Sequence, residues 1–550
     1  MRAARLSGFL CRVGVLALLH PSPAAGADKT ADPATLQSQL GGLVPGDTLH
    51  LNAGTYDHFV IDGRNGSPTE WITITGPDAG PPAVIQADPG PCCNTVEIVD
   101  SSYVVLRNLT IDGRGVDGAF GVSAKGGTGN LVHHVTVEGC TFLRHDAGQQ
   151  TVAISTKTPT WGWVIRRNRI AGAGTGLYLG NSDGTSPFIG GLIEHNLVQD
   201  TIGYNMEIKW QQPRPDVPGM PTAPTTTVIR HNVFIKTDRP SPSGDRPNLL
   251  VGGFPDSGPG SNDRYEIYGN LFFHNPRESL LQASGRVSIH DNIFVDVTGT
   301  AIRLQNHDLP LKLATVYNNT IFGAGVGVGF GSTATQGDAV VGNLIFADTP
   351  ITGPIANSSD NMTDAVANAG SYVVSPSLLL GAMDFYPLSG RCQGSALPLA
   401  QFAGDTDYDK DFNGTSKGGW IFRGAYAGEG ENPGWQLAAE VKELGSVDPG
   451  DGGTTWDGAD GVDAGVDAGT DTNLGGDDGA GDDGSYPGGE DAGGGSETDV
   501  SDSGSTDDKA GVIGGCGCHL DVNFGGMAVL LALGALLAIA VRRGTKRRKV

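Results

Sequence analysis

The chain has 550 residues, 86 of them glycine, and a formal net charge of −24. This length allows several ordinary domains or one long repeat domain with tails, and the acidic balance argues against a nucleic-acid partner. The excess charge is unevenly placed, because 18 Asp and Glu stand against one Lys between Ser446 and Ala510. The rest of the chain is therefore only mildly acidic.

Residues 1–27 have the pattern of an export signal. A basic start is followed by an apolar stretch from Val13 to Leu19, and Ala25 and Ala27 supply the small residues before the expected cleavage site. Export leads to an oxidising compartment, which permits disulfides. We expect one or two structural disulfides, whose pairing the sequence does not determine. The cysteines left after signal cleavage are Cys92, Cys93, Cys140, Cys392, Cys516 and Cys518.

Residues 32–43 predict a short helix. Asp32 suits an N-cap, Pro33 the first helical position, and Gly41 the C-terminal end. Three leucines recur at helical spacing on one face: Leu36, Leu40 and Leu43. This apolar face is expected to cover the open edge of the domain that follows.

One pattern recurs through residues 100–346, in which alternating apolar residues lead to an Asn and then to another short apolar run. The Asn positions are Asn168, Asn196, Asn232, Asn270, Asn292, Asn319 and Asn343, with Leu109 and Cys140 earlier in the same slot. Spacings of 22 to 38 residues, built from β-type runs, indicate a solenoid. They are too short and uneven for the four-stranded blades of a propeller. We therefore predict an all-β, right-handed parallel β-helix over residues 28–385, with the Asn side chains stacked in an internal ladder.

Two segments carry a resemblance to known proteins. Residues 45–56, Pro-Gly-Asp-Thr-Leu-His-Leu-Asn-Ala-Gly-Thr-Tyr, resemble the first-coil motif of β-helix proteins related to polysaccharide lyases, including the chondroitinase-B-like group. Residues 409–414 and 423–426 resemble the closing segment of many bacterial β-helix proteins, so residues 386–445 are expected to cover the C-terminal coil. Carboxylates alternate along the chain from Asp405 to Asp411. This segment could be a calcium-binding loop or a charged turn without a metal, and both interpretations stay open. No other cofactor or metal site is indicated.

The candidate site lies on the strand around residues 205–210. The alternation there points Met206, Ile208 and Trp210 inward, and it points Glu207 and Lys209 outward to solvent. By the same offset Tyr178 and Arg303 fall in the Glu207 column, which makes these three the expected substrate-binding residues. The longest loops adjoin this strand, and residues 207–248 hold six basic against four acidic residues, which suits an acidic polysaccharide.

Polysaccharide β-elimination needs a base that removes the proton beside a uronate carboxylate, and a cation that stabilises the developing charge. Lys209 is the expected base, and Arg230, Arg239 or Arg246 the expected cation. Glu207 and Lys209 could instead form only a solvated ion pair. A fold resemblance does not fix a reaction, so an epimerase and a non-catalytic module that binds glycan or matrix stay open beside the lyase.

The C-terminal part predicts an anchor. Residues 446–513 are rich in Gly and Asp, have little to bury, and should form a disordered spacer. Cys516 and Cys518 precede an apolar run from Phe524 to Val541, which at ~1.5 Å per residue spans ~27 Å, and six basic residues follow it. The run predicts a transmembrane helix with a cytoplasmic basic tail. The β-helix would then lie outside the cytoplasm, at the cell envelope or cell surface.

Residues 514–550 resemble the MYXO-CTERM type of C-terminal sorting signal through the two cysteines, the apolar span and the basic terminus. This resemblance implies that a sorting protease processes the Cys516 and Cys518 region before the protein reaches the surface. An unprocessed anchor with a single span is the alternative.

Overall fold

The computed structural model describes residues 26–90, 94–126 and 132–444. The export signal, Cys92, Cys93, the spacer 446–513 and the segment 514–550 with Cys516, Cys518 and the expected transmembrane helix lie outside the described residues, apart from Gly26 and Ala27. Within the described part, no helix is long and apolar enough to cross a membrane.

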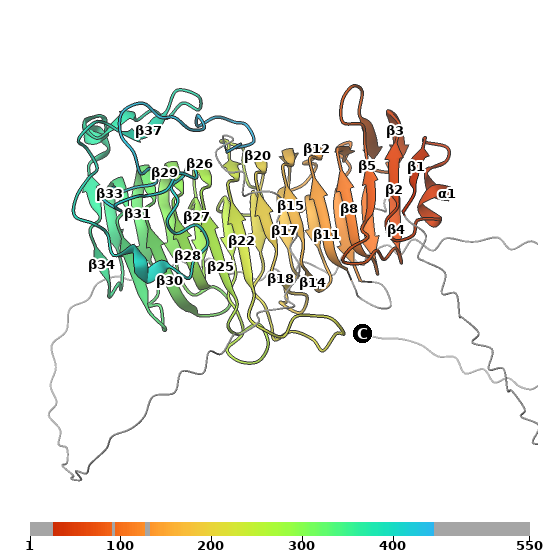
Figure 1. The fold of residues 1–550 in the computed structure, drawn as a ribbon, viewed down its shortest axis with the longest axis horizontal. Helices are drawn as coiled ribbons and strands as arrows, with labels where there is room; N and C mark the ends of the chain where they lie inside the picture. The colour runs from red at the N-terminus through yellow and green to blue at the C-terminus, as the bar shows by residue number, and fades with distance from the viewer. Residues whose placement is uncertain (1–25, 91–93, 127–131, 445–550) are drawn as a thin grey trace, which may run out of the picture. The chain divides into compact units, whose positions relative to one another are not determined.

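The chain winds through two long sheets in which every pairing is parallel, and the coils stack along one axis (Figure 1). The 13-stranded sheet comprises β1 (Asp28–Ala31), β2 (Thr48–Leu51), β5 (Ile72–Thr75), β8 (Ser102–Arg107), β11 (His133–Glu138), β15 (Val164–Arg166), β19 (Leu192–Glu194), β22 (Thr226–Arg230), β25 (Arg264–Tyr268), β28 (Gly285–His290), β30 (Leu311–Tyr317), β32 (Asp338–Val341) and β34 (Ser358–Ser359). This arrangement confirms the predicted parallel β-helix.

The 20-stranded sheet contains two ladders, which merge from β29 onwards. Its strands are β3 (Gly54–Asp57), β4 (Phe59–Asp62), β6 (Ala83–Gln86), β7 (Val96–Val99), β9 (Leu109–Asp112), β10 (Val122–Lys125), β12 (Thr141–His145), β13 (Val152–Thr156), β16 (Arg169–Ala173), β17 (Thr175–Leu179), β20 (Leu197–Thr201), β21 (Met206–Ile208), β23 (Val233–Ile235), β24 (Leu249–Val251), β26 (Leu271–Asn275), β27 (Leu281–Ala283), β29 (Ile293–Leu304), β31 (Thr320–Phe330), β33 (Leu344–Thr352) and β35 (Met362–Asp364). The short pair β14 (Thr160–Trp161) and β18 (Phe188–Ile189) extends one flank.

The Asn ladder is present as predicted. Each Asn side-chain oxygen accepts two hydrogen bonds from the Asn one coil earlier, one from its backbone amide and one from its side-chain amide. For example, Asn232 Oδ1 accepts from the backbone N of Asn196 at 3.0 Å and from its Nδ2 at 2.9 Å. The ladder continues one step beyond the prediction, because Asn343 donates to Asn361 in the same way. Buried polar groups are stable only when they are paired, so the ladder fixes the register of the coils.

Helix α1 (Leu36–Gly41) lies at the N-terminal end of the stack (Figure 1). It begins three residues later than Pro33, because residues 33–35 form a turn whose amides are bound by the Asp32 carboxylate. Leu36, Leu40 and Leu43 are buried and belong to the main core of the β-helix. Leu36 and Leu40 therefore form the buried face of the helix, whereas Leu43 is buried in the same core but lies beyond the end of the helix.

Parallel pairing ends at β35, and the expected boundary at residue 385 falls within β37 (Asp384–Pro387), which pairs antiparallel with β36 (Val373–Ser375). The 3-10 helices η1 (Val366–Ser371) and η2 (Leu399–Phe402) lie on either side of this pair in the chain. Residues 386–444, here called the C-terminal strap, then return along the flank of the stack (Figure 1). The strap was expected to cover only the last coil. It instead contacts coils from the one that holds Asp360 back to the one that holds Arg167.

Two of the cysteines fall within the described residues. Cys140 and Cys392 are buried free thiols, and they are not bonded to each other. Burial raises the pKa of each thiol to about 12. Neither therefore has the thiolate character of a reactive cysteine.

Candidate active site

Tyr178, Glu207 and Arg303 occupy one outward-facing column of the 20-stranded sheet. The register pairs Tyr178 with Glu207, and Arg303 follows three coils later through Leu250 and Gln282. This confirms the predicted column. The prediction that Glu207 faces solvent is wrong, since its exposed fraction is 2%.

Lys209 forms an ion pair with Glu207. Its amino group lies 2.9 Å from Glu207 Oε1, and 16% of its side chain is exposed. Lys157 comes from the coil before Tyr178 and Lys209 from the coil after it. The amino group of Lys157 lies 3.6 Å from the centre of the phenol ring, whereas that of Lys209 is 5.7 Å away. Four side chains from three successive coils therefore converge. This group, the lysine cluster, consists of Lys157, Tyr178, Glu207 and Lys209.

Sequence reasoning missed Lys157. It directly follows β13, as Lys209 directly follows β21, so the two lysines share one offset from the coil, and Lys125 at the end of β10 shares it too. That repeated offset was the available signal. Lys125 lies one coil before Lys157 and is paired with Glu97 at 2.9 Å, much as Lys209 is paired with Glu207.

The two amines of the cluster differ in basicity. Burial lowers the pKa of Lys157 to about 8, with the charge of Glu207 opposing the shift and that of Lys209 adding to it. Burial also lowers the pKa of Lys209, but Glu207 and Tyr178 outweigh it, and the pKa is raised overall. Lys157 can therefore lose its proton near neutral pH while Lys209 stays cationic. This division of roles suits Lys157 as the base.

Two loops add polar groups beside Lys209. Asp308 accepts a hydrogen bond from His307 at 2.9 Å, which with the charge of Lys209 lowers the pKa of its carboxyl.

Trp210 was expected to point inward. It is instead half-buried outside the core and donates to Ser182 O at 3.1 Å, because β21 ends at Ile208 and the alternation stops there.

The structure does not bring the three predicted arginines to Lys209. Arg230 lies on the other sheet, in β22, where Glu194 at 2.8 Å and Asp407 at 3.6 Å bind it. Arg239 and Arg246 belong to the loop before β24, whereas Lys209 follows β21, so they lie at the opposite end of neighbouring strands.

Each remaining predicted arginine also has local partners. Arg239 is paired with Asp146 at 2.7 Å, and Arg246 donates to Ser243 O at 3.2 Å and lies 5.7 Å from the Tyr204 ring. Arg303 lies 3.8 Å from Glu278 and keeps an exposed side chain. Of the seven residues predicted for the site, the cluster therefore unites Lys209, Glu207 and Tyr178.

The run from Asp405 to Asp411 does not form a calcium loop in the structure. Asp405 is bound by Arg264 at 2.9 Å, Asp407 by the Tyr268 hydroxyl at 2.9 Å, and Asp411 by backbone amides. Within the described ranges, no group of three or more His, Cys, Asp or Glu is placed to hold a metal ion. The charged turn is the better description of this segment.

No protein-family model matches the chain, and a search of curated proteins found no relative. Several solved structures are distantly similar. Pectate lyase Pel9A is 12% identical, with 76% of this chain and 96% of that chain covered and a TM-score of 0.41. The Azotobacter vinelandii mannuronan C-5 epimerase AlgE6 A-module is 17% identical, with coverages of 61% and 96% and a TM-score of 0.38. The PL6 family alginate lyase AlyGC is 13% identical, with a TM-score of 0.36; 61% of this chain is covered, and the match spans 51% of AlyGC, about half its length. The chain is thus distantly similar in fold to polysaccharide lyases and an epimerase.

Proposed function

We propose that this protein binds an acidic polysaccharide and abstracts the proton beside a uronate carboxylate, with Lys157 as the base. The observation that carries the proposal is the setting of the Lys157 amine. It is half-buried, lies 3.6 Å from the centre of the Tyr178 ring, and has its pKa lowered by burial to about 8. A base is most effective when its pKa lies near the working pH.

In β-elimination the Lys157 amine takes the proton from C5 of a uronate. The C4–O bond then breaks, a C4–C5 double bond forms, and the leaving oxygen takes up a proton. The Tyr178 phenol, beside Lys157, supplies a hydroxyl for that protonation. The Lys209 ammonium stabilises the negative charge that develops on the uronate carboxylate. The product is a shorter chain with an unsaturated end.

An epimerase is the runner-up reaction, because it shares the proton-abstraction step and returns a proton to C5 without breaking the chain. A non-catalytic module that binds glycan or matrix is the second candidate function. One observation favours it: Glu207 already neutralises Lys209, and the three predicted arginines lie away from the cluster.

One screen separates these functions. The purified protein is incubated with a panel of uronate polysaccharides in deuterated water. Absorbance of unsaturated ends indicates a lyase, deuterium at C5 without cleavage indicates an epimerase, and binding without either supports the module. Binding to no acidic polysaccharide would contradict the proposal as a whole.

The envelope location is also part of the proposal. Its support is the export pattern of residues 1–27 and the cysteine pair, apolar run and basic terminus of residues 514–550. The protein would face polysaccharide outside the cytoplasm, held by the C-terminal segment either as a membrane span or after processing at Cys516 and Cys518.

A further inference from the structure

The C-terminal strap places a lysine against a carboxyl group in the turn between β28 and β29. The Lys417 amino group lies 2.8 Å from Asp291 Oδ2, although the two residues are 126 positions apart in the chain. Their side chains are 4% and 2% exposed. The same amine donates to Tyr408 O at 2.8 Å, which helps to hold it in place. The pair is therefore fixed in position and shielded from water.

The surroundings of Asp291 are unusual for an ordinary ion pair. His290 Nδ1 lies 2.8 Å from the same Oδ2, and its ring is stacked between Tyr268 and Tyr317 at 4.7 Å from each. Asp291 Oδ1 and His290 Nε2 are buried without a hydrogen-bond partner. Burial raises the pKa of Asp291 to about 8, even though Lys417 opposes the shift. A carboxyl group this poorly solvated is readily protonated. The carbon of a protonated carboxyl group can be attacked by an amine.

We propose that Lys417 and Asp291 join as an amide, with a new bond between Lys417 Nζ and Asp291 Cγ. The Lys417 ammonium first passes a proton to the Asp291 carboxylate, 2.8 Å away. The amine then attacks the carboxyl carbon, one C–O bond breaks, and the oxygen leaves as water with one amine proton and the carboxyl proton. No oxidant or other reactant is needed. His290, next to the departing oxygen, is the positioning residue that relays the proton.

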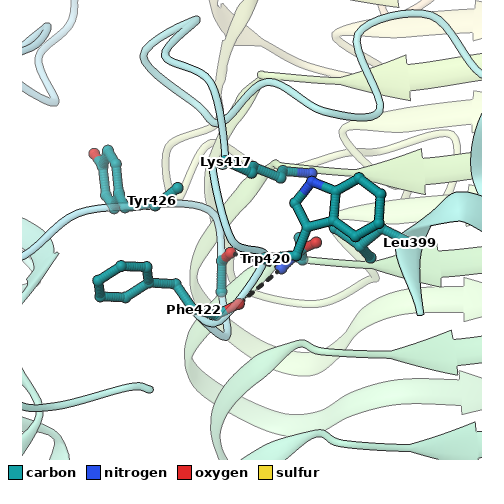
Figure 2. A pocket seen from close by; sticks show the side chains of 8 residues that line it. Leu399, Lys417, Trp420, Phe422 and Tyr426 are labelled. Atoms are coloured by element: carbon teal, nitrogen blue, oxygen red, sulfur yellow. Dashed lines mark hydrogen bonds between the residues drawn. The ribbon is translucent and has the colours of Figure 1, made fainter. Parts of the chain in front are cut away.

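Two physical effects favour this condensation. Groups held in reactive geometry reach effective concentrations on the order of 10⁵–10⁸ M. The two side chains are 4% and 2% exposed, so bulk solvent has little access to reverse the reaction. A cavity of about 10 Å³ lies beside Lys417, and Leu399 and Trp420 also line it (Figure 2). It has roughly the room of one water molecule, so the leaving water has a place beside the amine.

The position of the bond would let it hold the strap on the β-helix. The strap is also fastened by Arg423 to Asp360 at 3.0 Å and by Lys442 to Gly269 O at 2.8 Å. These contacts are non-covalent, and a pull on the chain beyond residue 444 would peel the strap from its end. An amide at Lys417 would stop such peeling and leave the coils intact.

The test is the mass of the denatured, purified full chain, followed by peptide mapping. We expect a mass lower than that of the sequence by one water molecule, and one branched peptide that joins Lys417 to Asp291. Lys417→Arg and Asp291→Ala should each restore the full mass. Asp291→Asn should lose one ammonia instead, because its amide can form the same bond.

The same digest contains a matched control. Lys312 is buried and lies 3.2 Å from Asp256, whose side chain is 76% exposed, so this solvated pair should stay unlinked. A wild-type chain of full mass, with tryptic cleavage at Lys417, would overturn the proposal. So would an equal mass loss in Lys417→Arg, which would place the lost water elsewhere.

Discussion

At the scale of single residues, the proposed reaction depends on the different basicities of two neighbouring amines, Lys157 and Lys209. Both lysines of the cluster are half-buried, and burial alone would lower the pKa of each. The position of Glu207 decides the outcome, because it is in contact with Lys209 and only near Lys157. One carboxylate therefore keeps one amine charged and leaves the other able to act as a base.

This arrangement predicts the pH dependence of the reaction. For the wild-type protein, kcat/KM should rise with pH through an apparent pKa near 8, as Lys157 loses its proton. Glu207→Gln should move that pKa lower, because the Glu207 charge favours the Lys157 ammonium. Lys209→Met should move it higher, because the Lys209 charge disfavours the same ammonium.

The check is a set of pH–rate profiles on one uronate polysaccharide. Arg303→Ala is the control, because Arg303 lies three coils or ~14 Å from Glu207 at strand spacing. It should change KM while the apparent pKa stays the same. If both cluster variants shifted the profile in one direction, or neither shifted it, Lys157 would not be the titrating base.

At the scale of the element, the Asn ladder holds each coil to the next. Asn232 accepts from Asn196 and donates to Asn270 and to Ile193 O. Asn232→Ala leaves several buried groups unpaired, at roughly 1–3 kcal/mol each. We expect a large loss of the free energy of unfolding, measured by urea denaturation.

The end of the ladder supplies the comparison. Asn361 is half-buried, so water can replace its bonds, and Asn361→Ala should cost clearly less than Asn232→Ala. Equal small losses for the two variants would mean that the ladder contributes little to stability.

The sequence predicted what is local and periodic. The ladder and the Glu207 column follow from repeats of one coil and from the alternation within a strand. Solvation was not predictable in this way, since the burial of Glu207 and Lys157 depends on side chains from other coils. Arg239 and Arg246 were misplaced because their loop and the segment after β21 are close in sequence but lie at opposite ends of neighbouring strands. Arg230 was misplaced because it lies in β22, on the other sheet. The strap was misjudged because its contacts, such as Arg264 with Asp405, join residues 141 positions apart.

At the scale of the whole molecule, the domain is expected to stand outside the cytoplasm on an acidic spacer. Protease added to intact spheroplasts should cut the spacer 446–513, which has little to bury, and release the β-helix domain with its parallel coils intact. Immunoblotting of the released fraction is the measurement. Full protection of the domain and spacer would show that the orientation is wrong.

The central claim is that Lys157 performs the proton abstraction, and one comparison tests it most directly. Initial rates of unsaturated-end formation on an acidic polysaccharide are measured for the wild type, Lys157→Ala and Lys125→Ala. Lys157→Ala should be slower by about 10²–10⁴-fold, the usual effect of losing a positioned base. Its thermal midpoint should not fall far, because a lowered amine pKa means that burying the ammonium opposes folding at pH 7.

Lys125→Ala removes an amine from the same offset one coil away, where it is already paired with Glu97, and should stay near the wild-type rate. We expect a large loss of rate for Lys157→Ala alone. An active wild type whose rate is unchanged in Lys157→Ala, or equally reduced in Lys125→Ala, would contradict it.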